Sequence, residues 1–188
     1  TTIPANIFRP LTNLTYLYID NCALTEINPA WFDTLGNLFV LAMYFNNFTT
    51  VPENAFNPLT NLFVLDIGFN PISSIPANTF RSLTSLQTLY LNQLRLTSVM
   101  TEWFATTPNL QYIFLNFNQI DELPTGVFTS INSLFYLGMW ANQLKTLSRT
   151  HFGNIQSLYY LDLDENNVNA LDRRLFEGAD NLYVFYFW

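Results

Sequence analysis

Three carboxylates near the end of the chain, Asp162, Asp164 and Glu165, come closest to metal-binding chemistry. Asp162 and Asp164 are two residues apart, so in an extended strand both side chains leave from the same face. Their oxygens could hold a hard cation such as Ca²⁺, which takes about six to eight oxygen ligands. Three carboxylates do not complete that shell. We therefore predict no metal site and interpret the group as a solvated acidic rim that favours a partner with a basic patch.

Side chains suited to catalysis are sparse. The single histidine, His151, directly precedes Phe152, and the single cysteine, Cys22, falls at a position expected to face the core, where a thiol is inert. A catalytic triad needs a nucleophile, a base and an orienting group in mutual reach, and no such set is apparent. The sequence also contains no glycine-rich phosphate loop, HExxH motif or paired CxxC motif. We predict no catalytic residues, no enzymatic activity and no cofactor.

Aromatic side chains are the other group with binding chemistry, since they make up 17% of the chain against 11% for charged residues. Tyr112, Tyr136 and Tyr160 are spaced 24 residues apart, and three further rings lie close to them in sequence. Tyr and Trp are enriched among the residues that dominate binding energy at interfaces. We predict that the rings and the carboxylates together form a partner-binding site: Tyr112, Phe114, Phe117, Tyr136, Trp140, Tyr160, Asp162, Asp164 and Glu165.

The elements that position these side chains follow one period. Phenylalanine recurs every 24 residues without a slip, and leucine keeps the same interval. A strict period of this length indicates stacked repeats. The two series are Phe8, Phe32, Phe56, Phe80, Phe104, Phe128, Phe152 and Phe176, and Leu14, Leu38, Leu62, Leu86, Leu110, Leu134, Leu158 and Leu182.

Each unit reads LxxLxLxxNxL followed by a variable arc that ends in a phenylalanine motif, as in LFVLDIGFNPISSIPANTFRSLTS. This pattern resembles the leucine-rich repeat family over the whole chain. The 24-residue unit with its late phenylalanine resembles the "typical" subfamily, best known from Toll-like receptor ectodomains and insect leucine-rich immune proteins. The resemblance implies an α/β-type repeat solenoid. It would be a horseshoe with a parallel concave β-sheet of about eight short strands and a mostly irregular convex side.

Alternation along each strand sorts the side chains into two faces. In the third unit Leu65 and Ile67 face the core, while Val64, Asp66 and Gly68 face outwards. We expect the eight periodic phenylalanines to turn inward from the convex side and stack as a spine, each ring pair adding about 0.5–1.5 kcal/mol beyond area burial. Unit positions 3, 5, 7 and 8 then form a concave face that carries fourteen other aromatics: Tyr16, Tyr18, Tyr44, Phe45, Phe69, Tyr90, Tyr112, Phe114, Phe117, Tyr136, Trp140, Tyr160, Tyr186 and Trp188.

An exposed apolar surface of that size usually marks a binding site. Three alternatives to partner binding remain open. Neighbouring rings could stack along the sheet, at the strand spacing of about 4.8 Å, and only stabilise it. Rings at the eighth position could fold over the edge of the solenoid, or a further segment could cover the face.

Asparagine holds the ninth position in five units, where its amide can satisfy backbone groups as the chain turns off the strand. The five are Asn46, Asn70, Asn118, Asn142 and Asn166. Cys22 and Leu94 replace it in the first and fourth units. The fourth unit also carries Trp103 beside the spine. We expect a local irregularity over residues 92–104, against the alternative of a tolerated variation without local consequence.

The period divides the chain as a single solenoid over 1–188. A half repeat covers 1–13, full repeats begin at 14, 38, 62, 86, 110, 134 and 158, and a final strand covers 182–188. Neither end carries the cap that terminal repeats normally need for solubility. We therefore expect a segment of a longer protein or, as the alternative, a last strand that pairs with another chain.

Charge and hydropathy exclude several classes of partner. The net charge is −7 and the seven basic residues are scattered, which argues against binding to nucleic acid or to an anionic membrane surface. No apolar run reaches the roughly 18–20 residues of a membrane span. Asn13 and Asn47 each begin an N-glycosylation sequon, which favours secretion.

The resemblance implies that the concave face binds a protein or glycoconjugate ligand outside the cell. The expected roles are innate immune recognition, as a receptor or secreted protein, and cell adhesion. The alternative is a structural protein that self-assembles into homo-oligomers through its aromatic face and uncapped ends.

Overall fold

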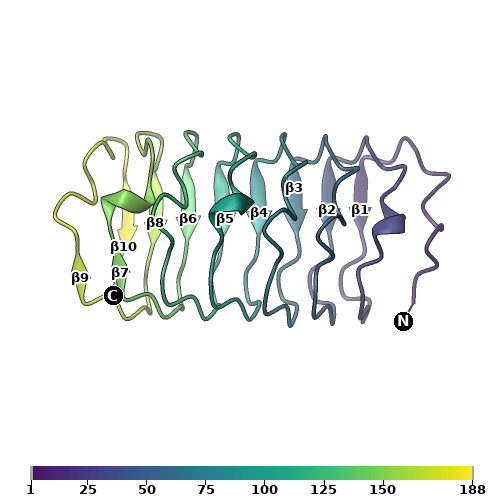
Figure 1. Ribbon diagram of the computed structural model, residues 1–188, viewed down its shortest axis with the longest axis horizontal. Helices are drawn as coiled ribbons and strands as arrows, with labels where there is room; N and C mark the ends of the chain where they lie inside the picture. The colour runs from purple at the N-terminus through teal and green to yellow at the C-terminus, as the bar shows by residue number, and fades with distance from the viewer. Residues whose placement is uncertain (1, 188) are drawn as a thin grey trace.

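The computed structural model describes residues 2–187, which form one row of stacked coils (Figure 1). Each coil contributes one three-residue strand to a single parallel sheet, in the order β1-β2-β3-β4-β5-β6-β8-β10. The strands are β1 (Tyr16–Tyr18), β2 (Val40–Ala42), β3 (Val64–Asp66), β4 (Thr88–Tyr90), β5 (Tyr112–Phe114), β6 (Tyr136–Gly138), β8 (Tyr160–Asp162) and β10 (Val184–Tyr186). The predicted solenoid with a parallel sheet is confirmed. Trp188, expected on the concave face, and Thr1 lie outside the described residues.

The register of the sheet follows the repeat. Leu41 pairs with Leu65, and Leu65 pairs with Leu89, so that equivalent positions of successive units lie side by side. These leucines are fully buried, because the alternation of each strand directs every second side chain into the core. After the first seven strands of this sheet the chain turns through a residue in the left-handed region at the eighth position, for example Phe69 with φ 55°.

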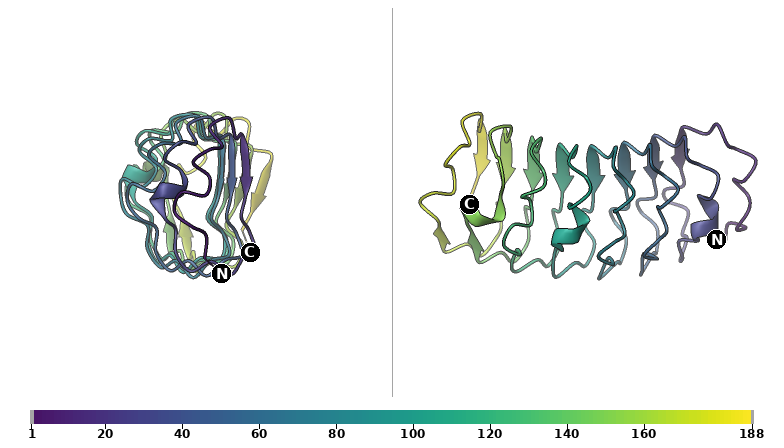
Figure 2. Two further views of the ribbon diagram at one scale, coloured as in Figure 1. Left: turned by 90° about the vertical axis from the view of Figure 1, so that its right-hand side faces the viewer. Right: turned by 45° about the horizontal axis from the view of Figure 1, so that its top comes forward.

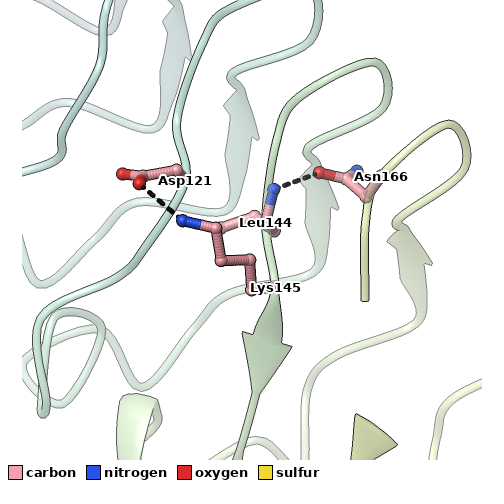
Figure 3. A network of polar contacts seen from close by, with 4 residues as sticks. All are labelled: Asp121, Leu144, Lys145 and Asn166. Carbon is pink, nitrogen blue, oxygen red and sulfur yellow. Dashed lines mark hydrogen bonds and ion pairs between the residues drawn. The ribbon is translucent and has the colours of Figure 1, made fainter. Parts of the chain in front are cut away.

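Buried asparagines close the turn after the strand, as the sequence predicts. The Asn142 side-chain oxygen accepts from the Ile120 N–H at 3.1 Å, and its amide donates to the Leu115 and Met139 carbonyls at 2.9 and 3.0 Å. Figure 3 shows the same bond one unit on, from the Leu144 N–H to Asn166 Oδ1 at 3.0 Å. Each asparagine therefore joins its own coil to the preceding one.

Leu94 lacks this amide, and the preceding turn changes in response. In other units the equivalent N–H donates to the side-chain oxygen of the asparagine. Here the Ile72 N–H donates instead to the Asn70 carbonyl at 2.8 Å. Strand β4 keeps its pairing with both neighbours. The effect of Leu94 is therefore a rerouted hydrogen bond in the turn of the third unit. The 3₁₀ turn of the fourth unit at Thr101–Trp103 has counterparts at the same unit position, Pro29–Trp31 and Arg149–His151.

The convex side is mostly irregular (Figure 2). Within residues 2–187 its helical segments are three 3₁₀ turns, η1 (Pro29–Trp31), η2 (Thr101–Trp103) and η3 (Arg149–His151). Two short strands, β7 (Thr146–Leu147) and β9 (Ala170–Leu171), pair in parallel there. Among residues 2–187, no helical segment has the length and hydropathy of a membrane span.

The phenylalanine spine forms in the interior but not at its last predicted member. Phe104, Phe128 and Phe152 follow one another with ring centroids 5.4 and 5.5 Å apart, and Phe32, Phe56 and Phe80 do so at 5.9 and 6.5 Å. The expectation for Phe176 was wrong, since this ring is 40% exposed and packs against Phe185 at 5.0 Å. A spine ring is buried only when a coil lies on each side of it, and no described coil follows that of Phe176. Phe8 is only partly buried.

Candidate binding face on the parallel sheet

Five aromatic rings form a continuous row across the sheet, which we call the ring ladder: Tyr90, Phe114, Tyr136, Tyr160 and Tyr186. Their centroids are 4.5, 4.6, 4.5 and 5.7 Å apart in that order. The first four rings are half-buried and the fifth is exposed. Each ring of the ladder therefore contacts its neighbours, two pairs stacked and two tilted, and part of each ring remains accessible.

The remaining predicted rings flank the ladder. Phe117 is 42% exposed and meets the half-buried Trp140 at 4.4 Å with ring planes at 62°. Tyr112 packs obliquely against Phe135 at 5.6 Å. The structure thus brings all six predicted rings onto neighbouring strands or the turns that follow them. The rings contact one another along the sheet, as the self-packing alternative expects, but they also retain accessible surface.

The predicted carboxylates lie at the end of the ladder, on and just after β8. Asp162 Oδ1 accepts from the Asp164 N–H at 3.2 Å, and Glu165 is exposed on the following turn. Partial burial raises the pKa of the Asp162 carboxyl, and the nearby Asp164 charge raises it further. Within residues 2–187 no three His, Cys, Asp or Glu side chains are arranged to hold a metal ion. The three carboxylates can act as an acidic rim.

A second acidic group lies over the first strands, and sequence reasoning did not include it in the site. Partial burial raises the pKa of the Asp66 carboxyl to about 6, although the Gly68 N–H donates to it at 2.9 Å. The charge of Asp20 raises the pKa of the neighbouring Tyr44 hydroxyl. The outward positions of Asp20 and Asp66 in their units were a signal that could have identified the group.

Basic side chains are missing from the concave face. In the described part of the chain positions 3, 5, 7 and 8 carry no Lys or Arg, whereas five of them carry Asp or Glu. The only lysine, Lys145, lies beyond β6 and pairs with Asp121 at 3.0 Å (Figure 3). The face therefore combines exposed aromatic surface with negative charge.

A further row of rings stands at the second unit position, just before the strands, and was not predicted as part of the site. Phe135 stacks on Tyr159 at 5.0 Å, and Tyr159 on Tyr183 at 5.3 Å. An open hollow of about 570 Å³ lies beside these three rings and Asp180. The sequence signal was an aromatic at the same position in successive units, which the strand alternation alone assigns to neither face.

The single histidine and the single cysteine make their hydrogen bonds within the scaffold. His151 is buried in η3, and its Nδ1 accepts from the Ser148 N–H at 3.2 Å. Burial lowers the pKa of this imidazole. Cys22 is half-buried, and its Sγ donates to the Asp20 carbonyl at 3.1 Å. Both sequon asparagines, Asn13 and Asn47, are exposed.

Comparison with known proteins identifies the repeat. The family described as leucine rich repeat matches residues 12–72, 41–93 and 84–144. No curated protein matches the sequence. The crystal structure of the TLR13–ssRNA13 complex is similar with a TM-score of 0.87 and 31% identity, covering 94% of this chain and 25% of that one. These matches confirm the predicted resemblance.

Two further solved structures show the fold alone. The leucine-rich repeat domain of APL1B has a TM-score of 0.76 and 23% identity, covering 92% of this chain and 49% of its own. A leucine-rich repeat protein of Leptospira interrogans has a TM-score of 0.67 and 22% identity, covering 99% and 52%. The chain therefore spans between a quarter and about half of the length of these relatives.

Proposed function

Because this chain belongs to the leucine-rich repeat family, we propose that it is a non-enzymatic binding module whose concave face takes a protein or glycoconjugate outside the cell. The ring ladder from Tyr90 to Tyr186 is the observation that carries the proposal. It supplies continuous, partly exposed aromatic surface on a rigid sheet, the kind of surface that contributes most to binding energy. We assign the anchors to Tyr112, Phe114, Phe117, Tyr136, Trp140 and Tyr160, and the charged rim to Asp162, Asp164 and Glu165.

Charge narrows the chemistry of the partner. A face that carries carboxylates and no basic side chain favours a partner with exposed Lys or Arg groups. Cations also bind over the faces of Tyr and Trp rings, most strongly over Trp. The partner we propose is therefore a basic protein surface, or a glycoconjugate with cationic groups.

The same charge argues against RNA, although the similar TLR13 structure is a complex with ssRNA13. Aromatic rings can stack bases, but binding of single strands also requires a positive groove along the backbone. The face carries Asp20 and Asp66 near its first strands and the acidic rim near its last ones. From the resemblance to Toll-like receptor ectodomains and insect leucine-rich immune proteins, we propose a role in innate immune recognition or adhesion.

A titration with defined probes tests the proposal. The probes are an Arg-Ser repeat peptide, a Glu-Ser repeat peptide of equal length, a chitin oligosaccharide and single-stranded RNA, each followed by calorimetry. We expect the Arg-Ser peptide to bind, more weakly at high salt, and Trp140→Ala to weaken it by about tenfold or more. Equal binding to wild type and Trp140→Ala, or preferential binding of RNA or of the Glu-Ser peptide, would contradict the proposal.

Self-association is the second candidate, and the exposed rings near β10 favour it. Tyr183 is 78% exposed, and Phe185, Tyr186 and Phe187 are exposed beside it. Aromatic surface of this kind could join two copies of the chain into a structural assembly. Light scattering against concentration distinguishes the candidates, since a chain that remains monomeric at tens of micromolar would exclude self-assembly.

A further inference from the structure

An open hollow of about 500 Å³ crosses the ends of the first four strands, away from the acidic rim. The rings of Phe45 and Phe69 line it, together with Asn47 and the polar side chains of Asn21, Gln93 and Arg95. Aromatic surface bordered by amides and a guanidinium suits a ligand that has one apolar face and several hydroxyl groups. A pyranose ring has this composition.

Phe45 exposes an aromatic ring at the eighth position of the second unit. It is 52% exposed and adopts the left-handed conformation with φ 51°, where bulky residues are rare. The fold does not require an aromatic there, since Gln93 and Ala141 hold the same unit position with φ 49° and 53°. The Phe45 ring lies 4.3 Å from Phe69, and the pair is held at the open hollow. The left-handed backbone belongs to the fold at this position, but the exposed ring does not, and exposed aromatic surface of this kind is available to a ligand.

Asn47 lies in the same hollow, two residues after Phe45, and begins the sequon completed by Thr49. Its backbone N–H donates to the Leu24 carbonyl at 2.7 Å, which fixes the backbone at this point. Its side chain is exposed. The Asn47 amide is therefore accessible for modification next to two rings.

We propose that Asn47 carries an N-linked glycan whose first N-acetylglucosamine rests in this hollow against Phe45 and Phe69. In forming the link, Asn47 Nδ2 bonds to C1 of the sugar and loses a proton. The bond from C1 to a lipid diphosphate breaks, and that diphosphate leaves with the electron pair. The co-reactant is a lipid-diphosphate-linked oligosaccharide of the secretory pathway. The apolar face of the sugar packs on the rings, and Asn21, Gln93 and Arg95 offer hydrogen bonds to its polar groups.

This assignment rests on the extracellular location proposed above but not on the partner-binding role of the ring ladder. It also divides the concave side between two uses. The glycan would cover the strand ends of the first units, and the ladder from Tyr90 to Tyr186 would stay open for a partner.

Expression of the full chain in a secretory eukaryotic host tests the proposal, with Asn13 as an internal control because it lies outside the hollow. Glycopeptide mass spectrometry reads occupancy. An endoglycosidase then trims each glycan to one N-acetylglucosamine, and Tm is compared with Asn47→Gln. We expect the single sugar at Asn47 to raise Tm by about 2–4 °C, the shift that one ordinary contact produces in a chain of this size. In Phe45→Ala this gain should disappear.

Alanine suits position 45 because Ala141 holds the equivalent place in the fold. If Phe45→Ala fails to fold, Phe69→Gln serves in its place, since Gln93 is its equivalent in the next unit. Asn13→Gln should leave Tm unchanged in the wild type and in Phe45→Ala. An unmodified Asn47, a gain that survives removal of the Phe45 ring, or an equal gain at Asn13 would overturn the proposal.

Discussion

The Phe114 ring packs against the Tyr136 ring, with centroids 4.6 Å apart and ring planes at 32°, although the two residues are not partners in the sheet. The register pairs Phe114 with Gly138 and Tyr112 with Tyr136. Tyr136 can turn towards Phe114 because Gly138 has no side chain. A Cβ at Gly138 would lie 2.9 Å from Tyr136 Cε1 and 2.8 Å from Asn116 Oδ1. The glycine is thus where the ring ladder passes from the fifth unit position to the third.

Gly138→Ala should therefore displace the Tyr136 ring and disturb Asn116, whose Oδ1 accepts from the Trp140 N–H at 2.9 Å. We expect a loss of about 1–3 kcal/mol in the free energy of unfolding, as for other overpacked sites. Urea denaturation measures it. The control is the same change in a Tyr136→Ala background, where the cost should fall. The backbone itself accepts alanine at this position, since Ala42 holds it in β2. An equal loss of stability in both backgrounds would therefore contradict the role of the Tyr136 ring.

Phe128→Ala should lower the free energy of unfolding much more than Phe114→Ala, because Phe128 belongs to the core and Phe114 to the open face. Phe128 is 1% exposed within the spine, and removing such a ring costs about 3–5 kcal/mol through lost burial and a cavity. Phe114 is half-buried on the open side, so its loss should cost about 1 kcal/mol, close to the value of its stacking contacts. Denaturation of both variants is the measurement, and equal costs would mean that the ladder is core.

Asp66→Asn should change how stability depends on pH. The folded chain holds the pKa of this carboxyl at about 6, above the ordinary value of 3.8, because of partial burial. Between these values the folded state binds a proton that the unfolded state does not, so this group adds stability as pH falls from 7 towards 4. The variant should be more stable than wild type at pH 7, and the difference should shrink as pH falls.

Denaturation at a series of pH values, compared between wild type and Asp66→Asn, measures this effect. The comparison is needed because His151 acts in the opposite direction. Burial lowers the pKa of its imidazole below 6.5. As pH falls through 6.5 the unfolded chain binds a proton at His151 before the folded chain does, so the stability that His151 contributes is lost. His151 is present in both proteins and cancels in the difference. A stability difference that does not vary with pH would contradict the assignment to Asp66.

Asn142→Ala should strongly lower the free energy of unfolding, whereas Leu94→Asn should not raise it. Loss of the Asn142 amide leaves the buried Ile120 N–H and the Leu115 carbonyl without this partner, which we expect to cost about 2–4 kcal/mol. At position 94 the Ile72 N–H already donates to the Asn70 carbonyl, and the replaced Leu94 is buried, so the added amide should bring no net gain in stability. Thermal denaturation tests both, and a large gain from Leu94→Asn would show that the rerouted bond is weak.

Particular residues show what could be read in advance. The interval of 24 residues placed Leu41, Leu65 and Leu89 in register, and the alternation placed Asp66 and Phe114 on the open face. The same reasoning misplaced Phe176, because burial of a spine ring depends on a coil that follows it. It also left out Tyr159, since a residue that precedes its strand is not assigned to a face by alternation.

By itself the sequence determined the repeat, the parallel sheet, the inward leucines and the five asparagines that close turns, because these depend on spacing along the chain. Only the tertiary structure decided which rings meet. Phe114 reaches Tyr136, and Phe45 reaches Phe69, through contacts between coils about one repeat apart in sequence. Those contacts depend on side-chain direction and on the space that neighbours such as Gly138 leave. The pKa of Asp66 was decided in the same way, by the surroundings that the folded sheet gives it.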